Sequence, residues 1–379
     1  MKSTGLFAGI GGFELGFRKA GIDCDMLCEI DDAAVSILKK GFPNVEIARD
    51  IRELKKLPQS DIIAGGFPCQ NLSLVGDKTG IHGVQSGLVN DFFRLVSAQR
   101  RKPKWLVLEN VPFMLWQKKG EAVRHVIGQF EQLGYSWAYR VVDSRSFGLP
   151  QRRRRVLFVA SKEEDPREVL FSDEVQRDFD TDDGAAPCGF SWTEGRVGLG
   201  WAANAVPTLK GGSSIGIPSL PAIWFRKTGV IATPHICDAE RLQGFEVDWT
   251  RTTIQGVPLK EGFRCKLVGN AVNVPLAVWL GTRLQIPGTY DESRTVKEYD
   301  GGTWPNAAWG TKGRAFAVKV SEYPVARRYT GLESFLKYPT KMLSHKAATG
   351  FLRRARGGTL NFADGFLEAV ESHIEQVAA

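Results

Sequence analysis

One cysteine, Cys69, stands in a context that suits a nucleophile. It follows Pro68 in the run Ile62–Ser73, Ile-Ile-Ala-Gly-Gly-Phe-Pro-Cys-Gln-Asn-Leu-Ser, in which an apolar strand leads into a rigid proline and a polar loop. A thiol reacts as its thiolate, which neighbouring cations stabilise. A buried structural thiol is the alternative. The other five cysteines show no CxxC spacing and no histidine at zinc-ligand spacing, so we expect reduced core thiols and no metal site.

A carboxylate and an amide, Glu109 and Asn110, directly follow the apolar run Trp105–Leu108. This run has the composition of a buried strand. In a parallel sheet the carboxyl ends of the strands meet at the edge where such folds bind ligands. Glu109 and Asn110 are therefore candidates for a ligand site at that edge.

Four consecutive arginines, Arg152–Arg155, follow Gln151 between two predicted strands. Such a run is typical of a solvated face or of a phosphate-binding patch. If the run continues into the strand, alternation places Arg153 and Arg155 on one face of it.

A glycine-rich turn, Gly9-Ile10-Gly11-Gly12, joins a predicted strand at Thr4–Ala8 to a helix. Such a turn lets backbone N–H groups approach a ligand at the helix N-terminus. The full dinucleotide pattern G-x-G-x-x-G fails because Glu14 occupies the third glycine position. The turn fits a nucleotide site and a plain tight turn equally well.

Acidic residues follow the next two apolar segments. Glu29 ends the predicted strand Asp23–Cys28, where Rossmann-like folds hold a ribose, and Asp50 follows the third segment at the same edge. Glu29 is thus a candidate ribose ligand, and Asp50 a candidate partner for an adenine amino group. A helix-capping role is the alternative for either acid.

Length and composition favour one large α/β core with a smaller lobe, since the chain has 379 residues, 43% of them hydrophobic. The net charge of +8 suits a polyanionic partner such as nucleic acid, although solubility alone also explains a modest excess. No apolar run reaches the ~18 residues that a membrane helix needs, and the start lacks a signal-peptide pattern. We therefore expect a cytoplasmic protein that has no membrane partner.

The character of the chain changes twice along its length. Strand and helix patterns alternate up to about residue 160, which predicts an α/β fold with a Rossmann-like sheet. An acidic linker, Glu163–Asp183, precedes Ala185–Ile231, which is rich in Gly, Pro and Trp and predicts a small, mostly irregular β lobe. Beyond residue 286 lies a basic, partly helical extension. Its run Lys337–Arg356 suits either phosphate contact or an ordinary solvated helix face.

In order and spacing, six motifs resemble those of the DNA (cytosine-5) methyltransferase family over roughly residues 3 to 285. They are Leu-Phe-Ala-Gly-Ile-Gly-Gly at Leu6, Gly-Phe-Pro-Cys-Gln at Gly66, Glu-Asn-Val at Glu109, Gln-Arg-Arg-Arg-Arg at Gln151, Glu-Arg-Leu-Gln-Gly-Phe at Glu240 and Gly-Asn-Ala-Val at Gly269. The resemblance implies a bacterial or phage restriction-modification type. It also implies a catalytic S-adenosylmethionine-binding domain at 1–160 plus 265–285, a target-recognition lobe at 161–264 and a C-terminal extension at 286–379.

The resemblance implies a role for the candidate residues. Cys69 would add to C6 of a cytosine extruded from the helix, which makes C5 nucleophilic, while Glu109 would bond N3 and the exocyclic amine. Pro68 would aim the cysteine, and Asn110 would hold that loop. Arg155, with Arg153 supporting it, would reach O2 of the cytosine or a phosphate, and Gln151 would orient these arginines.

The implied cofactor is S-adenosyl-L-methionine, with Glu29 on its ribose and Asp50 on its adenine. The matching cofactor-binding positions are Phe7, Gly9, Ile10, Gly11, Gly12, Glu29, Ile30, Asp50, Ile51 and Asn270. Four positions depart from the family pattern: Gly5 replaces an Asp, Ile30 a large aromatic residue, Gln85 an Arg in the flap Leu74–Gly87, and Ala271 a Ser. Each departure would weaken the binding of cofactor or DNA.

The function implied is methyl transfer to C5 of cytosine in a short specific duplex DNA sequence. The partners implied are duplex DNA and a cognate restriction endonuclease, and we expect a monomer. Two alternatives remain open. One is an RNA cytosine-5 methyltransferase, and the other is a catalytically impaired DNA-binding protein.

Overall fold

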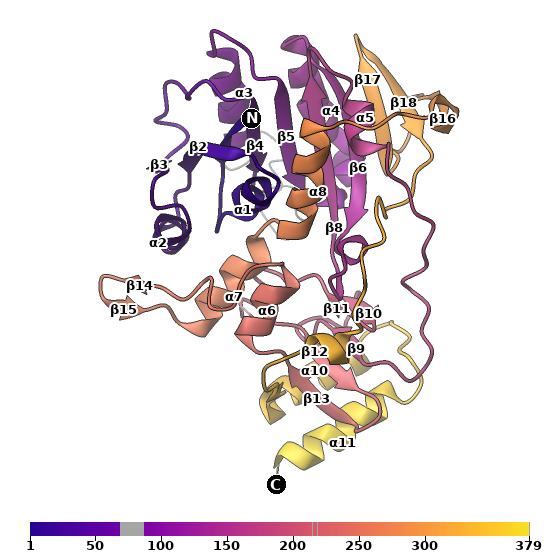
Figure 1. Ribbon diagram of the computed structural model, residues 1–379. Helices are drawn as coiled ribbons and strands as arrows, with labels where there is room; N and C mark the ends of the chain where they lie inside the picture. Colours follow the sequence, from indigo (N-terminus) through magenta and orange to yellow (C-terminus); the bar gives the residue numbers. More distant parts are fainter. Residues whose placement is uncertain (69–86, 214, 218, 379) are drawn as a thin grey trace. The chain divides into compact units, whose positions relative to one another are not determined.

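The computed structural model describes residues 1–68, 87–213, 215–217 and 219–378, which form two compact units (Figure 1). The first unit comprises 1–146, 154–176 and 272–326, and the second comprises 147–153, 177–271 and 327 onward. The predicted extension 286–379 is therefore divided between the two units. Cys69, Gln85 and most of the predicted flap lie outside the described residues.

The first unit is built on one mixed sheet. Its described strands are β1 (Lys2–Leu6), β2 (Asp23–Cys28), β3 (Glu46–Ala48), β4 (Ile62–Gly66), β5 (Trp105–Asn110), β6 (Ser136–Asp143), β8 (Arg154–Ser161), β16 (Thr295–Glu298), β17 (Ala307–Thr311) and β18 (Arg314–Val318). They follow the order β16-β18-β17-β6-β8-β5-β4-β1-β2-β3. The part from β5 to β3 is parallel and the rest antiparallel. The predicted α/β fold is confirmed.

Helices cover both faces of this sheet (Figure 1). They are α1 (Gly12–Lys19), α2 (Asp32–Gly41), α3 (Leu88–Ser97), α4 (Glu121–Gln132), α5 (Pro166–Leu170) and α8 (Val274–Gln285). Side chains alternate between the faces of a strand. On β1, Leu6 packs into the large core cluster with Phe92 of α3 and Phe130 of α4, whereas Gly5 faces Glu14 of α1. The glycine turn and the strand ends are thereby held between two helical layers.

The second unit contains a smaller antiparallel sheet with the order β10-β9-β12-β13-β19. The strands of this sheet are β9 (Cys188–Phe190), β10 (Trp201–Ala203), β12 (Ala222–Phe225), β13 (Val230–Thr233) and β19 (Lys341–Met342). Two further pairs of strands in the unit are β7 (Gln151–Arg152) with β11 (Val206–Pro207), and β14 (Thr253–Ile254) with β15 (Val257–Pro258). Its helices are α6 (Ile236–Leu242), α7 (Glu261–Asn270), α9 (Leu332–Phe335), α10 (His345–Arg356) and α11 (Phe366–Ala378). The strands are two to four residues long, too short to give the sequence a clear period.

The end of the chain completes the core of the second unit. Phe366 of α11 packs against Phe190 of β9 and Trp224 of β12, with ring centroids 4.9 and 5.4 Å apart. Phe351 of α10 lies 5.1 Å from Phe190, and β19 pairs with β13. The lobe between residues 177 and 271 thus shares one hydrophobic core with residues 343–370.

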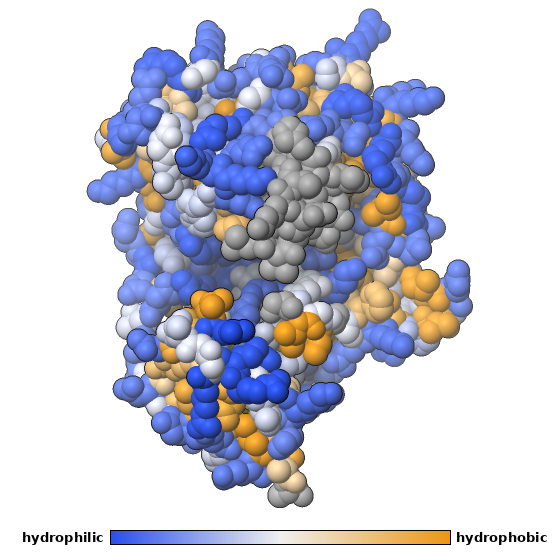
Figure 2. All heavy atoms as spheres, turned by 180° about the vertical axis from the view of Figure 1, so that it is seen from behind, coloured by the Kyte–Doolittle hydropathy of each residue, from blue (hydrophilic) through white to orange (hydrophobic). Residues whose placement is uncertain are grey.

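The surface of the second unit includes exposed apolar side chains around the β14–β15 hairpin (Figure 2). Val257 and Phe263 are both more than half exposed. The hairpin, through Val257, and the start of α7, through Phe263, therefore present apolar surface to solvent. Among the described residues, no helix is long and apolar enough to cross a bilayer.

Two helical glycines predict opposite effects of one substitution. A Cβ on Gly16 of α1 would lie 2.3 Å from Cβ of Ala277 in α8, whereas a Cβ on Gly128 of α4 would meet no described atom within 4 Å. Gly16→Ala should lower the free energy of unfolding by about 1–3 kcal/mol because it separates α1 from α8. Gly128→Ala should raise it by roughly 0.5–1 kcal/mol through helix propensity. Denaturant unfolding checks both, and equal effects of the two changes would contradict the close packing of α1 on α8.

Candidate functional site

The register of β4 on β5 places Glu109 beside the segment that leads to Pro68. The parallel pairing runs from Ile62 opposite Trp105 to Gly66 opposite Glu109. A Cβ on Gly66 would lie 3.2 Å from Oε2 of Glu109, so glycine leaves room for the carboxyl group. Asn110 donates from Nδ2 to the carbonyl of Phe67 at 3.2 Å, and its Oδ1 accepts the N–H of Val111 at 2.8 Å. Asn110 thus holds the backbone next to Pro68.

The antiparallel pairing of β5 with β8 brings Arg155 to Glu109. Nε of Arg155 lies 2.8 Å from Oε1 of Glu109, and the two side chains are only 12% and 11% exposed. The contact is an ion pair without the alignment of a hydrogen bond, so Oε1 keeps its capacity to accept one. A nearly desolvated pair of this kind attracts strongly, because little water screens it. The strand end therefore presents a fixed carboxyl group with a guanidinium at its side.

Arg153 lies in the second unit, because the arginine run divides there into β7 and β8. Its guanidinium is fully buried and donates to the carbonyls of Leu209, Gly269 and Ala271. Gln151 is also buried, and its Oε1 accepts the N–H of Leu209 at 3.1 Å. Both side chains therefore brace backbone segments of this unit, and Gln151 supports Arg153 through Leu209.

The glycine turn after β1 forms a cradle at the start of α1. Phe7, Gly9 and Gly11 have φ values of 57°, 56° and 86°, in the left-handed region that only glycine adopts without strain. Glu29 accepts the N–H of Gly9 at 2.7 Å through Oε2 and that of Asp31 at 2.8 Å through Oε1. A Cβ on Gly9 would meet no atom of the described residues within 4 Å, so these residues leave space above the turn.

The other predicted cofactor residues differ in what they offer. Ile30 is 61% exposed, and an apolar surface at that strand end suits the face of an aromatic ring. Asp50 is held by hydrogen bonds from Arg52, which lower the pKa of its carboxyl group and keep it ionised. The side chains of Ile10 and Ile51 are buried, which leaves only their backbones for a ligand. Asn270 lies in the second unit, where it ends α7 beside Gly211.

A buried carboxyl group, Glu14, explains why glycine stands at position 5. A Cβ on Gly5 would lie 2.0 Å from Oε1 of Glu14, so a larger residue there would displace the Glu14 carboxyl group from its position. Glu14 is 3% exposed, and its Oε2 has no hydrogen-bond partner among the described residues. In the sequence, Glu14 stands out only because it breaks the G-x-G-x-x-G pattern. The sequence signal for the buried acid is a pair of residues: Gly5 has no side chain on the strand, and Glu14 places a carboxyl group on the helix that follows.

The five described cysteines are poor nucleophiles. Burial raises the pKa of Cys24, Cys28 and Cys265 to about 12 and that of Cys188 to about 11. Burial also raises the pKa of Cys237, and the charge of Asp248 adds to the effect. All five are therefore protonated near neutral pH, as expected of core thiols.

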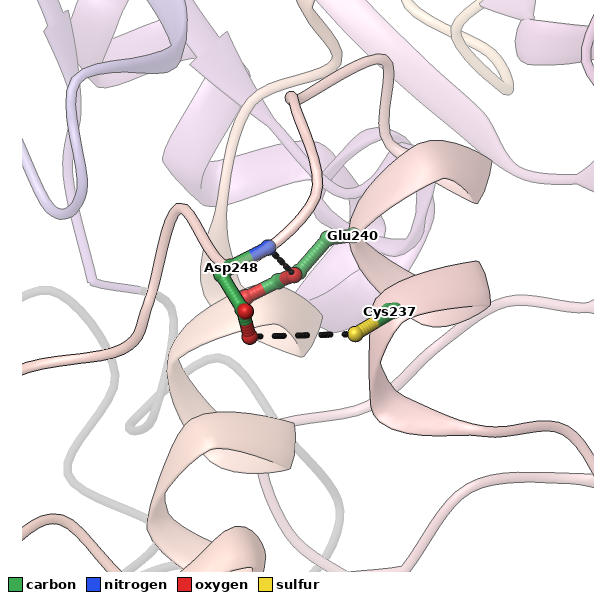
Figure 3. A group of neighbouring side chains, drawn as sticks. All are labelled: Cys237, Glu240 and Asp248. Carbon is green, nitrogen blue, oxygen red and sulfur yellow. Dashed lines mark hydrogen bonds between the residues drawn. The ribbon is translucent and has the colours of Figure 1, made fainter. Parts of the chain in front are cut away.

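One group of possible metal ligands occurs among the described residues, formed by Cys237, Glu240 and Asp248 in the second unit (Figure 3). Glu240 is fully buried and accepts the N–H groups of Asp248 and Thr250 at 2.7 and 2.8 Å. Arg264 lies 3.0 Å from both carboxylates and supplies their counter-charge. The arrangement joins α6 to α7 as a satisfied ion-pair network, so the Glu-Arg-Leu-Gln-Gly-Phe motif braces the fold.

Comparisons with known proteins agree with the predicted family. Residues 1–187 match the model of the C-5 cytosine-specific DNA methylase family. Type II methyltransferase M2.BsuMI of Bacillus subtilis (strain 168) is 44% identical over 98% of this chain and 97% of its own length. M.NgoFVII of Neisseria gonorrhoeae, also a type II methyltransferase, is 36% identical, but over only 42% of this chain and 43% of its own.

The fold is similar to that of two solved structures. The Dnmt2 methyltransferase of S. pombe has a TM-score of 0.57, and the methyltransferase EhMeth of Entamoeba histolytica has one of 0.54. Each is 15% identical to this chain, and the similarity covers 75% and 76% of the chain and 98% of each structure. At this identity the likeness concerns the fold.

Glu14 predicts a pH dependence of stability. Burial raises the pKa of its carboxyl group to about 7 from an ordinary value of 4.5. The folded chain therefore holds a proton that the unfolded chain releases, and the resulting stability is full below about pH 4.5 and is lost as the pH rises through 7. Glu14→Gln removes this dependence. Relative to that variant, the wild type should lose roughly 3 kcal/mol of unfolding free energy between pH 4.5 and 8.

Denaturant unfolding at several pH values measures this difference. Glu53→Gln is the matched control, because Glu53 is exposed and a solvated carboxyl group keeps its hydration on folding. Parallel pH curves for the wild type and Glu14→Gln would contradict the burial of a proton at Glu14.

Proposed function

This chain belongs to the C-5 cytosine-specific DNA methylase family, and from that premise we propose that it methylates C5 of cytosine through a transient covalent bond between Cys69 and C6. The chain is a DNA (cytosine-5) methyltransferase, as its family and its type II relative indicate. The observation that carries the mechanism is the ion pair of Glu109 and Arg155, held by strand register beside the segment that leads to Cys69.

Cys69 acts as the nucleophile in this mechanism. C5 of cytosine is unreactive toward a methyl donor until a thiolate adds to C6 and pushes an electron pair toward C5. The new bond joins Sγ to C6, and it breaks when C5 loses its proton after methylation. The other five cysteines are protonated at neutral pH by burial, so Cys69 is the thiol left for this role.

Glu109 and Arg155 act on the base that receives this attack. Glu109 bonds N3 and the exocyclic amine, which draws electron density from the ring while the thiolate adds. Arg155 holds the carboxyl group in place and reaches toward O2 of the base. Asn110 keeps the backbone of Phe67 fixed, and Pro68 then limits the directions in which Cys69 can point.

The residues around the glycine turn fit S-adenosylmethionine. The described residues leave space above Gly9, the Glu29 oxygens can accept from ribose hydroxyls, and exposed Ile30 can offer an apolar surface to adenine. Asp50 is ionised and can accept from the adenine amino group. When bound, S-adenosylmethionine supplies the methyl group.

The substrate we propose is duplex DNA with a short specific target sequence. A base inside the duplex is out of reach, so the enzyme must extrude it, at a cost of a few kcal/mol. The type II relatives also favour a cognate restriction endonuclease that recognises the same sequence. The enzyme acts as a monomer in this proposal.

Methyl transfer tests the nucleophile. Wild type incubated with labelled S-adenosylmethionine and mixed-sequence duplex DNA should transfer label to cytosine, and Cys69→Ala should transfer none. Cys188→Ala is the matched control, and it should keep the activity because Cys188 is a core thiol of the second unit. RNA of the same sequence should accept little label. Equal transfer by wild type and Cys69→Ala would refute the mechanism.

A second substitution tests the carboxyl group. Glu109→Gln keeps the shape of the side chain but removes its charge and its ability to hold a proton, so the turnover number should fall roughly 10²–10⁴-fold. Glu322→Gln is the control, since Glu322 pairs with the neighbouring Arg154 and should change turnover little. Single-turnover methylation assays measure both, and comparable rates for the two variants would remove Glu109 from the chemistry.

A further inference from the structure

The segment from residue 327 to residue 356 concentrates cations and contains few acids. Between residues 327 and 356 the chain has one acid, Glu333, against eight cations: Arg327, Arg328, Lys337, Lys341, Lys346, Arg353, Arg354 and Arg356. Between residues 177 and 271 of the second unit, five of the ten cations form ion pairs among the described residues. There, ion pairs join Lys210 to Glu194, Arg226 to Asp182, Arg241 to Asp238, Arg251 to Asp248 and Arg264 to Glu240.

Two of the eight cations already have structural roles. Arg354 donates to the carbonyls of Trp192 at 2.7 Å and Glu194 at 3.2 Å, and Arg356 forms an ion pair with Glu371 of α11. Lys341 lies on β19, an edge strand of the small sheet, where a lysine also discourages the addition of another strand. These three residues therefore have roles that need no ligand.

Lys346 and Arg353 remain on α10, both exposed and without an ion pair among the described residues. They are seven residues apart, which is two helical turns, so they point to the same side about 10 Å from each other. The opposite side of α10 buries Ala348, Phe351 and Ala355 in the core of the second unit. The helix is thus fixed on the small sheet with its cations directed away from it.

We propose that the exposed face of α10, through Lys346 and Arg353, binds backbone phosphates of the DNA that flanks the target base. The inference rests on the proposed function, which makes duplex DNA the substrate. Unpaired cations on a rigid helix suit regularly spaced phosphates, and such contacts add affinity without reading sequence. Because α10 packs on β9 through Phe351 and Phe190, the contact positions the small sheet on the duplex.

The salt dependence of DNA binding tests this proposal. Each phosphate contact contributes about −0.9 to the slope of log K against log salt concentration. Lys346→Gln with Arg353→Gln should make the slope shallower by about 1.8, and each single change by about 0.9. The probe is a mixed-sequence DNA duplex, titrated by fluorescence anisotropy between about 50 and 200 mM salt.

Two control variants separate phosphate contact from structure and from net charge. Lys39→Gln with Lys40→Gln removes the same charge from exposed positions at the end of α2 and should leave the slope unchanged. Lys346→Arg with Arg353→Lys keeps both charges and should keep the wild-type slope. The thermal midpoint of the Gln variants should match the wild type, because both side chains are exposed.

The outcomes distinguish this proposal from the one on which it rests. Wild type that neither binds nor methylates duplex DNA overturns the proposed function and this inference with it. Wild type that does both, with an unchanged slope in Lys346→Gln/Arg353→Gln, overturns the inference alone and makes α10 an ordinary solvated helix. A slope lowered equally by the Lys39/Lys40 variant would also overturn it.

Discussion

The register of three strands determines the candidate site. β4 and β5 pair in parallel so that Gly66 is opposite Glu109, and β8 returns antiparallel so that Leu157 is opposite Glu109. A slip of one residue on either side would turn the side chains to the other face of the sheet. The ion pair of Glu109 with Arg155 and the bond from Asn110 to Phe67 both depend on this register. The geometry of the site is therefore a property of the sheet.

Much of this arrangement could be predicted from the sequence, because it follows from strand order. Asp23–Cys28 is a strand as predicted, and the fold is the expected α/β type. Glu109 and Asn110 were placed at a strand end by the apolar run before them, and the structure has them there. Strand ends in a parallel sheet share an edge, so a local pattern is enough to bring distant residues together.

The sequence could not show contacts that depend on three-dimensional packing. Arg153 and Arg155 belong to different units because the strand is interrupted between them, and alternation alone does not reveal this interruption. The absence of an Asp at Gly5 suggested weaker cofactor binding, yet the side chain of Glu14, nine residues later on α1, fills the space beside Gly5. Residues 343–370 complete the core of the small sheet. The strands of this sheet are too short to show a hydrophobic period, so the sequence does not predict this packing.

In the proposed mechanism, strand register brings Glu109 and the segment carrying Cys69 to the same base. A crystal structure of the enzyme trapped on duplex DNA containing 5-fluorocytosine tests it most directly, because fluorine at C5 blocks the elimination that would release the thiol. The proposed mechanism predicts a bond from Sγ of Cys69 to C6 and places the Glu109 carboxyl group about 3 Å from N3 of that base. A bond to another residue, or a Glu109 carboxyl group directed away from the base, would contradict it.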